Sequence, residues 1–199
     1  AQIGNIEIEP QPVFRVGIFC CGPCPEAVAL INLLNAERNQ QNSTRRNLKN
    51  HYPLVLEAFK AIHPDISSSQ GQFHSKLQEL QPHLRELREI YNRDYRSMAV
   101  TIEYSGPTAN AYLLAYVPGC INQAEKAFEY AFATMPTRTR SFLQSPRMRI
   151  EFHLFDLNTV GWSRTREELL DLGCVQQWPG HLDIYPHKFD LHNSDGLSA

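Results

Sequence analysis

The stretch that decides the fold reads Phe14-Arg-Val-Gly-Ile-Phe-Cys-Cys-Gly-Pro-Cys-Pro-Glu-Ala-Val-Ala-Leu-Ile-Asn-Leu-Leu34. It begins with a short apolar run rich in Val, Ile and Phe, which is typical of a buried strand, and this run ends at Gly22-Pro23. Apolar residues at helical spacing follow at once. Pro25 suits the first position of a helix, and the positive end of the helix dipole favours the acidic Glu26. The stretch therefore predicts a strand, a tight turn and a helix, with backbone amides at the turn that can bind an anionic or polar ligand.

The composition argues against several classes of protein. A chain of 199 residues can bury a core as one domain, and its formal net charge of -2 gives no general attraction to nucleic acid or to an anionic membrane. No apolar run is long enough to span a bilayer, and no basic-then-apolar signal pattern stands at the N-terminus. Five cysteines, two of them adjacent, do not resemble a secreted disulfide framework. We therefore expect a cytoplasmic protein with reduced thiols, no membrane contact and no nucleic-acid partner.

A second strand is predicted to end on an acidic residue. The segment from Arg149 to Asp156 is mostly apolar, and Gly161-Trp162 then leads into a helix around Arg164 to Leu172. A carboxylate at the carboxyl end of a strand, close to a glycine turn, is where nucleotide-binding sheets hold ribose hydroxyls. Asp156 is therefore a candidate ribose ligand. The alternative is that Asp156 only caps the helix that follows.

These segments resemble motifs of class I S-adenosylmethionine-dependent methyltransferases. The run from Ile18 to Ala27 resembles the first motif of the family, and Asp156-Leu157 resembles the second. Asp190-Leu191, after a possible third strand near His181 to Tyr185, resembles the acid that accepts a hydrogen bond from the adenine amino group. The resemblance implies an α/β fold with a Rossmann-like parallel sheet and S-adenosylmethionine as the cofactor. The cofactor-binding residues that it implies are Phe19, Cys20, Cys21, Gly22, Glu26, Asp156, Leu157 and Asp190.

The first motif departs from the family pattern at three positions. Ile18 stands where an acid is usual, and Cys20 and Cys24 stand where glycines are usual. A side chain at a position of positive φ costs roughly 1 kcal/mol and occupies space near the ligand. The chain also ends where the family continues into further strands. We therefore expect a domain that binds the cofactor, with three cases left open: a methyltransferase that is still active, a domain that has lost catalysis, or an incomplete fragment. In the last case a protein partner or a missing C-terminal part completes the sheet.

A long and mainly helical interval separates the two motifs. Helical spacing predicts helices over residues 51–62, 73–95, 109–116 and 121–135, with Pro82 as a kink or a new helix start and a break at Pro118-Gly119. The segment from Thr137 to Arg149 is predicted to be a basic, exposed connector. We expect three parts: residues 1–35 as the first βα unit, residues 36–147 as a helical insertion, and residues 148–199 as the rest of the sheet. Within the insertion, Ala111 to Pro118 resembles a helix that precedes the first strand in some methyltransferase-like proteins.

The cysteines allow other chemistries. Cys21-Gly-Pro-Cys24 has the form of the redox tetrapeptide of thioredoxin-like oxidoreductases, which also lies between a strand and a helix start. Cys20, Cys21 and Cys24 could also join a distant histidine around zinc or an iron-sulfur cluster, but the sequence has no second paired motif, so no metal site is expected. A non-catalytic interaction module of a larger assembly is the remaining alternative.

Overall fold

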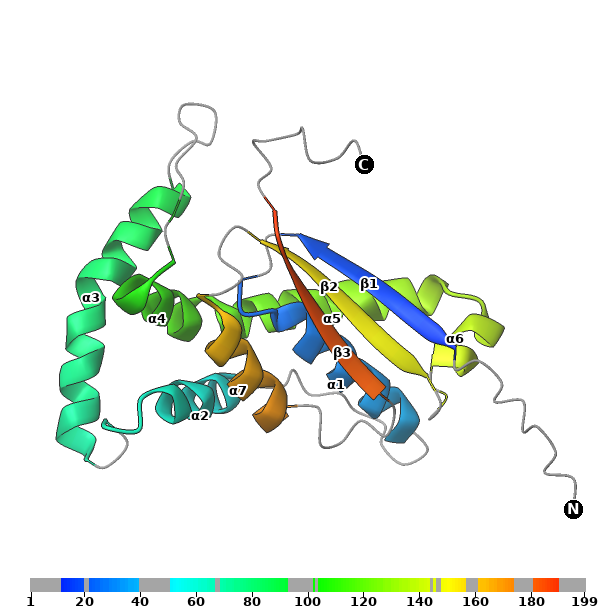
Figure 1. Ribbon diagram of the computed structural model, residues 1–199, viewed down its shortest axis with the longest axis horizontal. Helices are drawn as coiled ribbons and strands as arrows, with labels where there is room; N and C mark the ends of the chain where they lie inside the picture. The colour runs from blue at the N-terminus through cyan, green and yellow to red at the C-terminus, as the bar shows by residue number, and fades with distance from the viewer. Residues whose placement is uncertain are drawn as a thin grey trace, which may run out of the picture.

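The structure is a computed structural model that describes residues 12–19, 22–39, 51–66, 69–92, 102, 104–143, 145, 148–156, 161–173 and 181–189. This described part is an α/β structure with a three-stranded parallel sheet and seven helices (Figure 1). In chain order the elements are β1 (Val13–Phe19), α1 (Pro25–Asn39), α2 (Tyr52–Ile62), α3 (Gln70–Asn92), α4 (Gly106–Ala115), α5 (Val117–Thr134), α6 (Thr137–Leu143), β2 (Arg149–Asp156), α7 (Ser163–Gly173) and β3 (His181–Lys188). The expected α/β class is therefore confirmed.

The strand order brings the two motif segments together. The order is β1-β2-β3, and both pairs of neighbouring strands are parallel. Phe19 at the end of β1 lies opposite Phe155, the last residue but one of β2. The carboxyl ends of all three strands consequently meet at one edge of the sheet, where the arrowheads lie in Figure 1. The turn after β1 and the acid that ends β2 both lie at this edge.

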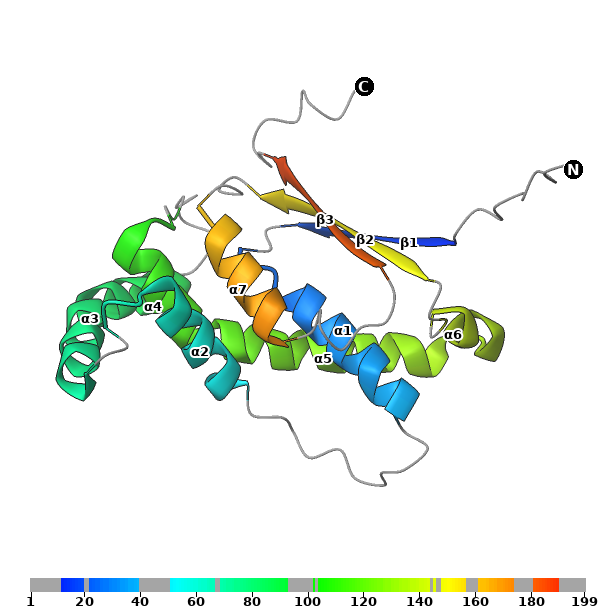
Figure 2. The same cartoon turned by 60° about the horizontal axis from the view of Figure 1, so that its bottom comes forward.

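The helices α1, α5 and α7 cover one face of the sheet, and no described helix covers the other face (Figure 2). Side chains alternate between the two faces along each strand, so every second residue of a strand points toward the helices. Ile150, Phe152 and Leu154 of β2 are fully buried against the helices. On α1, almost every residue from Ala27 to Leu34 is buried, because α5 and α7 also pack against this helix. One cluster of buried apolar side chains runs through α1, α2, α5, β2 and α7.

The helical interval forms close to the predicted positions, with two differences. α5 begins at Val117, because Pro118 lies in its first turn, where the missing N–H of proline costs no hydrogen bond. α6 occupies Thr137–Leu143, where a connector was predicted, and its Leu143 is buried. α3 continues through Pro82 and bends along its length in Figure 1. Among the described helices, none has the length and apolar character needed to cross a bilayer.

Candidate functional site

The turn between β1 and α1 has the backbone conformation of a glycine turn. Gly22 has a φ of 50° and Cys24 a φ of 62°, so both lie in the left-handed region that L side chains rarely adopt. Cys24 is nevertheless a cysteine, and its side chain is 0% exposed. The described chain from Gly22 to Pro25 thus makes a tight turn that directs the backbone into the N-terminus of α1.

Two residues predicted to bind the cofactor are in direct contact. The backbone N–H of Gly22 donates a hydrogen bond to the Oδ2 atom of Asp156, with 3.0 Å between nitrogen and oxygen. These residues are 134 positions apart in the chain. Asp156 is the last residue of β2, so its carboxylate reaches across the edge of the sheet to the turn that follows β1. The contact fixes the turn against the neighbouring strand.

Aromatic rings form a wall on one side of this turn. A Cβ atom built on Gly22 would lie 3.6 Å from Cε2 of Trp162 and 3.8 Å from Cε1 of Tyr112. Trp162 precedes α7 and Tyr112 belongs to α4, and the ring of Tyr104 packs against both, at centroid distances of 5.6 Å and 4.9 Å. A Cβ atom at these distances would make ordinary van der Waals contacts with the rings, so the positive φ, and not the rings, favours glycine here.

Two polar groups at this site lack hydrogen-bond partners. The Oε2 atom of Glu26 and the indole Nε1 of Trp162 are both buried and accept or donate no hydrogen bond among the described residues. Trp162 is only 1% exposed. Burial raises the pKa of Glu26 from 4.5 to about 7, although a hydrogen bond from its own backbone opposes the shift. Buried polar groups are normally paired, so these two groups make the surroundings of the turn a candidate binding site.

Two further titratable groups lie near Glu26. The hydroxyl of Tyr112 lies 3.9 Å from Sγ of Cys120 on α5. Burial is the main cause that raises the pKa of Cys120, and the negative charge of Glu26 raises it further. Burial likewise raises the pKa of Tyr112. The thiol and the phenol therefore both stay protonated and neutral near pH 7.

The remaining predicted site residues are only partly covered by the structure. Cys20, Cys21, Leu157 and Asp190 lie outside the described residues, and of Phe19 only the backbone is described, as the end of β1. The redox alternative for the cysteine pair therefore stays a prediction. Within the described part of the chain, no group of three or more His, Cys, Asp or Glu side chains is arranged to hold a metal ion.

The sequence did not indicate every residue of this site. Tyr104 and Cys120 carry no motif, and they reach the turn only because the helical interval folds back over the edge of the sheet. The single signal for Tyr112 was the resemblance of its segment to a helix near the first strand of methyltransferase-like proteins. Glu26 was expected as a helix start and, from the resemblance, as a cofactor-binding residue, but the sequence gave no sign that its carboxyl would be buried.

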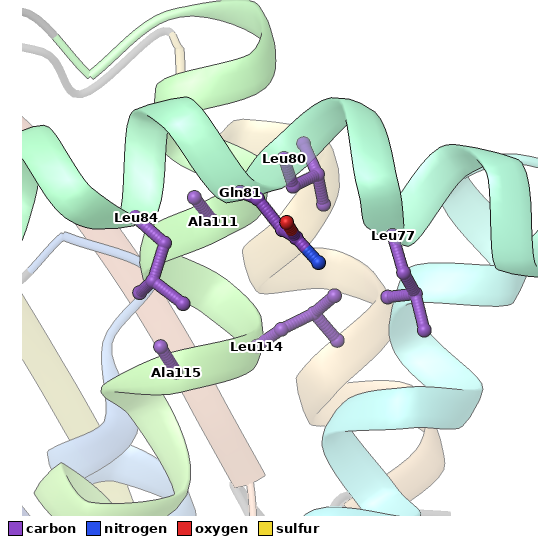
Figure 3. Close-up of a pocket in the computed structure, with 7 residues that line it drawn as sticks. All are labelled: Leu77, Leu80, Gln81, Leu84, Ala111, Leu114 and Ala115. Carbon is purple, nitrogen blue, oxygen red and sulfur yellow. The ribbon is translucent and has the colours of Figure 1, made fainter.

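A separate pocket of about 200 Å³ lies between α3 and α4 (Figure 3). Its walls are apolar apart from one amide side chain, and they consist of Leu77, Leu80, Gln81, Leu84, Ala111, Leu114 and Ala115. The lining carries no charged or nucleophilic group. The pocket therefore offers apolar contact and no acid-base chemistry.

The uncovered face of the sheet carries polar and aromatic side chains. Arg15 donates a hydrogen bond to Glu151 at 2.8 Å, and Arg149 donates one to Asp183 at 2.7 Å. Nearer the carboxyl ends, nitrogen atoms of two histidine rings lie 3.0 Å apart across β2 and β3, and one of these rings stacks on Tyr185. We call this surface the open face, and its members are Arg15, Arg149, Glu151, His153, Asp183, Tyr185 and His187.

Comparison with known proteins finds no relative that would identify this site. No protein-family model, no curated protein and no solved structure matches the chain. The function is therefore inferred from the geometry of the site and from the resemblance of its motifs.

Proposed function

We propose that the chain is a methyltransferase-like domain that binds S-adenosylmethionine, or a related adenosyl ligand, at the carboxyl edge of a Rossmann-like sheet. The hydrogen bond from Gly22 to Asp156 is the observation that carries the proposal. In open parallel sheets, ligands bind outside the carboxyl ends of the strands, with a glycine turn and a strand-end acid side by side. The parallel order β1-β2-β3 supports the same assignment.

Each described residue of the site has a role that its chemistry allows. The Gly22 turn and the N-terminus of α1 provide backbone N–H groups for polar parts of the ligand. A carboxylate has about four acceptor sites, so Asp156 can accept bonds from ribose hydroxyls while it holds Gly22. The rings of Trp162 and Tyr112 provide an apolar wall for a base. The proposal concerns binding, and it assigns no residue a catalytic role.

Calorimetric titration with S-adenosylmethionine and S-adenosylhomocysteine tests the proposal. We expect one ligand to bind per chain with a submillimolar dissociation constant. Asp156→Ala should weaken the affinity about tenfold or more, because the ribose hydroxyls lose their charged hydrogen-bond acceptor. Asp156→Asn keeps an acceptor oxygen for Gly22 and should lose less. Asp171→Ala, which alters an exposed acid on α7, is the matched control and should bind as the unaltered chain does. A folded chain that gives no heat with either ligand would contradict adenosyl binding.

The open face favours a second candidate function, that of an interaction module. Parallel sheets are normally covered on both faces, whereas described helices cover only one face of this sheet. We propose that a partner protein supplies the second layer. A photo-crosslinking side chain in place of Tyr185 should then give a discrete cross-linked product in cells, whereas the same group in place of Tyr130, an exposed residue of α5, should not. Equal yields at both positions, or none at Tyr185, would count against the module.

A further inference from the structure

We propose that Glu26 makes the adenosyl site selective for a positively charged ligand, one with an ammonium or sulfonium group, and that Glu26 releases its proton when this ligand binds. The inference rests on the proposed adenosyl site and adds the charge of the ligand and the proton linkage. It follows from the position of Glu26 in the chain, from the buried Oε2 atom that accepts no hydrogen bond from a described residue, and from the charges of the described groups nearby.

Glu26 lies next to the proposed ligand-binding turn in the chain. Glu26 lies in the first turn of α1, directly after the Gly22 turn that Asp156 holds. Its Oε2 atom is buried, and no described residue donates a hydrogen bond to it. The Nε1 atom of Trp162, whose ring packs against Gly22, is also buried without a partner. A ligand on this turn could therefore pair with one oxygen and one N–H group that no described residue satisfies.

Within the described part of the chain, the groups placed beside Glu26 and beside Gly22 carry no positive charge. On α5 the thiol of Cys120 lies close enough for Glu26 to raise its pKa, and on α4 the phenol of Tyr112 contacts that thiol. Both groups are neutral near pH 7, because burial raises both pKa values. Around Gly22, four positions before Glu26, lie the acid Asp156 from the end of β2 and the uncharged indole of Trp162 from the start of α7. A cation from the ligand would supply a counter-charge for the Glu26 carboxylate that these described groups do not provide.

Burial explains the protonation state of the Glu26 carboxyl. The pKa of Glu26 is raised to about 7 chiefly by burial, so near pH 7 about half of the molecules carry a proton on Glu26. A bound cation favours the carboxylate and lowers its pKa. Binding then converts the protonated carboxyl and the free cation into a carboxylate paired with the bound cation, and the released proton passes to the buffer. A neutral ligand has no such effect.

Calorimetry in two buffers of different ionisation enthalpy, phosphate and Tris, tests the inference at pH 7. S-adenosylmethionine serves as the cationic ligand and 5′-methylthioadenosine as the neutral one. We expect release of about half a proton with the former and almost none with the latter. In Glu26→Gln the proton release should disappear, and the affinity for S-adenosylmethionine should fall about tenfold while that for 5′-methylthioadenosine is kept. Glu57→Gln, an exposed acid of α2, is the control and should change neither quantity.

The possible results separate the inference from the proposed function. Two results would overturn the role of Glu26 and leave the adenosyl site in place. The first is that both ligands bind with the same proton release. The second is that Glu26→Gln binds S-adenosylmethionine with the same affinity as the unaltered chain does. Failure of both ligands to bind to the folded chain would overturn the adenosyl site, and this inference with it. The proton release of the unaltered chain decides the question even if Glu26→Gln does not fold.

Discussion

Cys24 holds a backbone conformation that favours glycine, with a φ of 62° and a fully buried side chain. This conformation costs an L residue roughly 1 kcal/mol that glycine does not incur. Cys24→Gly should therefore be more stable than Cys24→Ala by about 1 kcal/mol, because both variants lose the thiol but only alanine keeps the strained Cβ. Urea unfolding of the two variants measures the difference.

The control for this comparison is Ala29, a buried residue inside α1. There the order should reverse, and Ala29→Gly should lose about 1 kcal/mol because glycine weakens a helix interior. A Cys24→Ala variant that is as stable as Cys24→Gly, or more stable, would show that the turn is not strained.

Asp156 stabilises the fold as well as the proposed site, since it accepts the N–H of Gly22 at 3.0 Å. Asp156→Ala should cost about 1 to 2 kcal/mol, because the part-buried N–H loses its acceptor, and Asp156→Asn should cost less than about 1 kcal/mol. Thermal unfolding compares the two variants. Equal losses in both would mean that the negative charge, and not the acceptor oxygen, stabilises the turn.

The sequence could predict the contact between Gly22 and Asp156 for a simple physical reason. A strand that ends in a glycine turn and a strand that ends on an acid must meet at the same edge if both belong to one parallel sheet. The burial of Glu26 and the approach of Tyr112 could not be predicted in this way, because they depend on how α4 and α5 pack over that edge. The spacing of apolar residues within one segment does not indicate such packing between segments.

Replacing glycine by alanine should change the stability in opposite directions at two positions, one in a helix and one in a turn. Gly71 lies in α3 without a positive φ, and a Cβ there would meet no atom within 4 Å. Gly71→Ala should therefore stabilise the chain by about 0.5 to 1 kcal/mol. Gly22→Ala should destabilise it by about 1 kcal/mol, because the φ of 50° strains any side chain. Urea unfolding of both variants checks the signs, and a stabilising Gly22→Ala would contradict the assigned turn geometry.

Periodic apolar spacing predicted most elements of the structure but not all of their ends. The strand Arg149–Asp156 and the helix α2 agree with the sequence, because apolar runs and helical spacing continue there without interruption. α6 was predicted wrongly as a connector, since the first five residues of Thr137–Leu143 are all polar or charged, although the segment forms a short helix that buries Leu143. Proline misled the prediction at the start of α5, where the first turn of a helix tolerates it.

For the whole molecule, the buried carboxyl of Glu26 should make stability depend on pH. Between pH 4.5 and about pH 7, the Glu26 carboxyl keeps its proton in the folded chain and has lost it in the unfolded chain. The contribution of Glu26 to the free energy of unfolding should therefore fall as the pH rises through this window, and stay level above it. The total fall should be on the order of 2 kcal/mol, after allowance for the partial exposure of Glu26. Glu26→Gln cannot titrate, so relative to the unaltered chain it should gain stability between pH 5 and pH 8.

Urea unfolding at pH 5 and pH 8 measures this difference, with Glu57→Gln as the control for an exposed acid. The control should follow the unaltered chain at both pH values. A stability difference between the Glu26→Gln variant and the unaltered chain that is the same at both pH values would show that Glu26 titrates normally.

The amide resonance of Gly22 gives the most direct test of adenosyl binding, because the Gly22 N–H lies at the turn and donates a hydrogen bond to Asp156. The measurement is a titration of the ¹⁵N-labelled chain with S-adenosylhomocysteine, followed through the amide resonances. We predict a saturable shift of the Gly22 resonance at submillimolar ligand, while the resonance of Gly71 in α3 stays in place. A Gly22 resonance that does not move at millimolar ligand, in a chain whose other amides show it to be folded, would contradict the account.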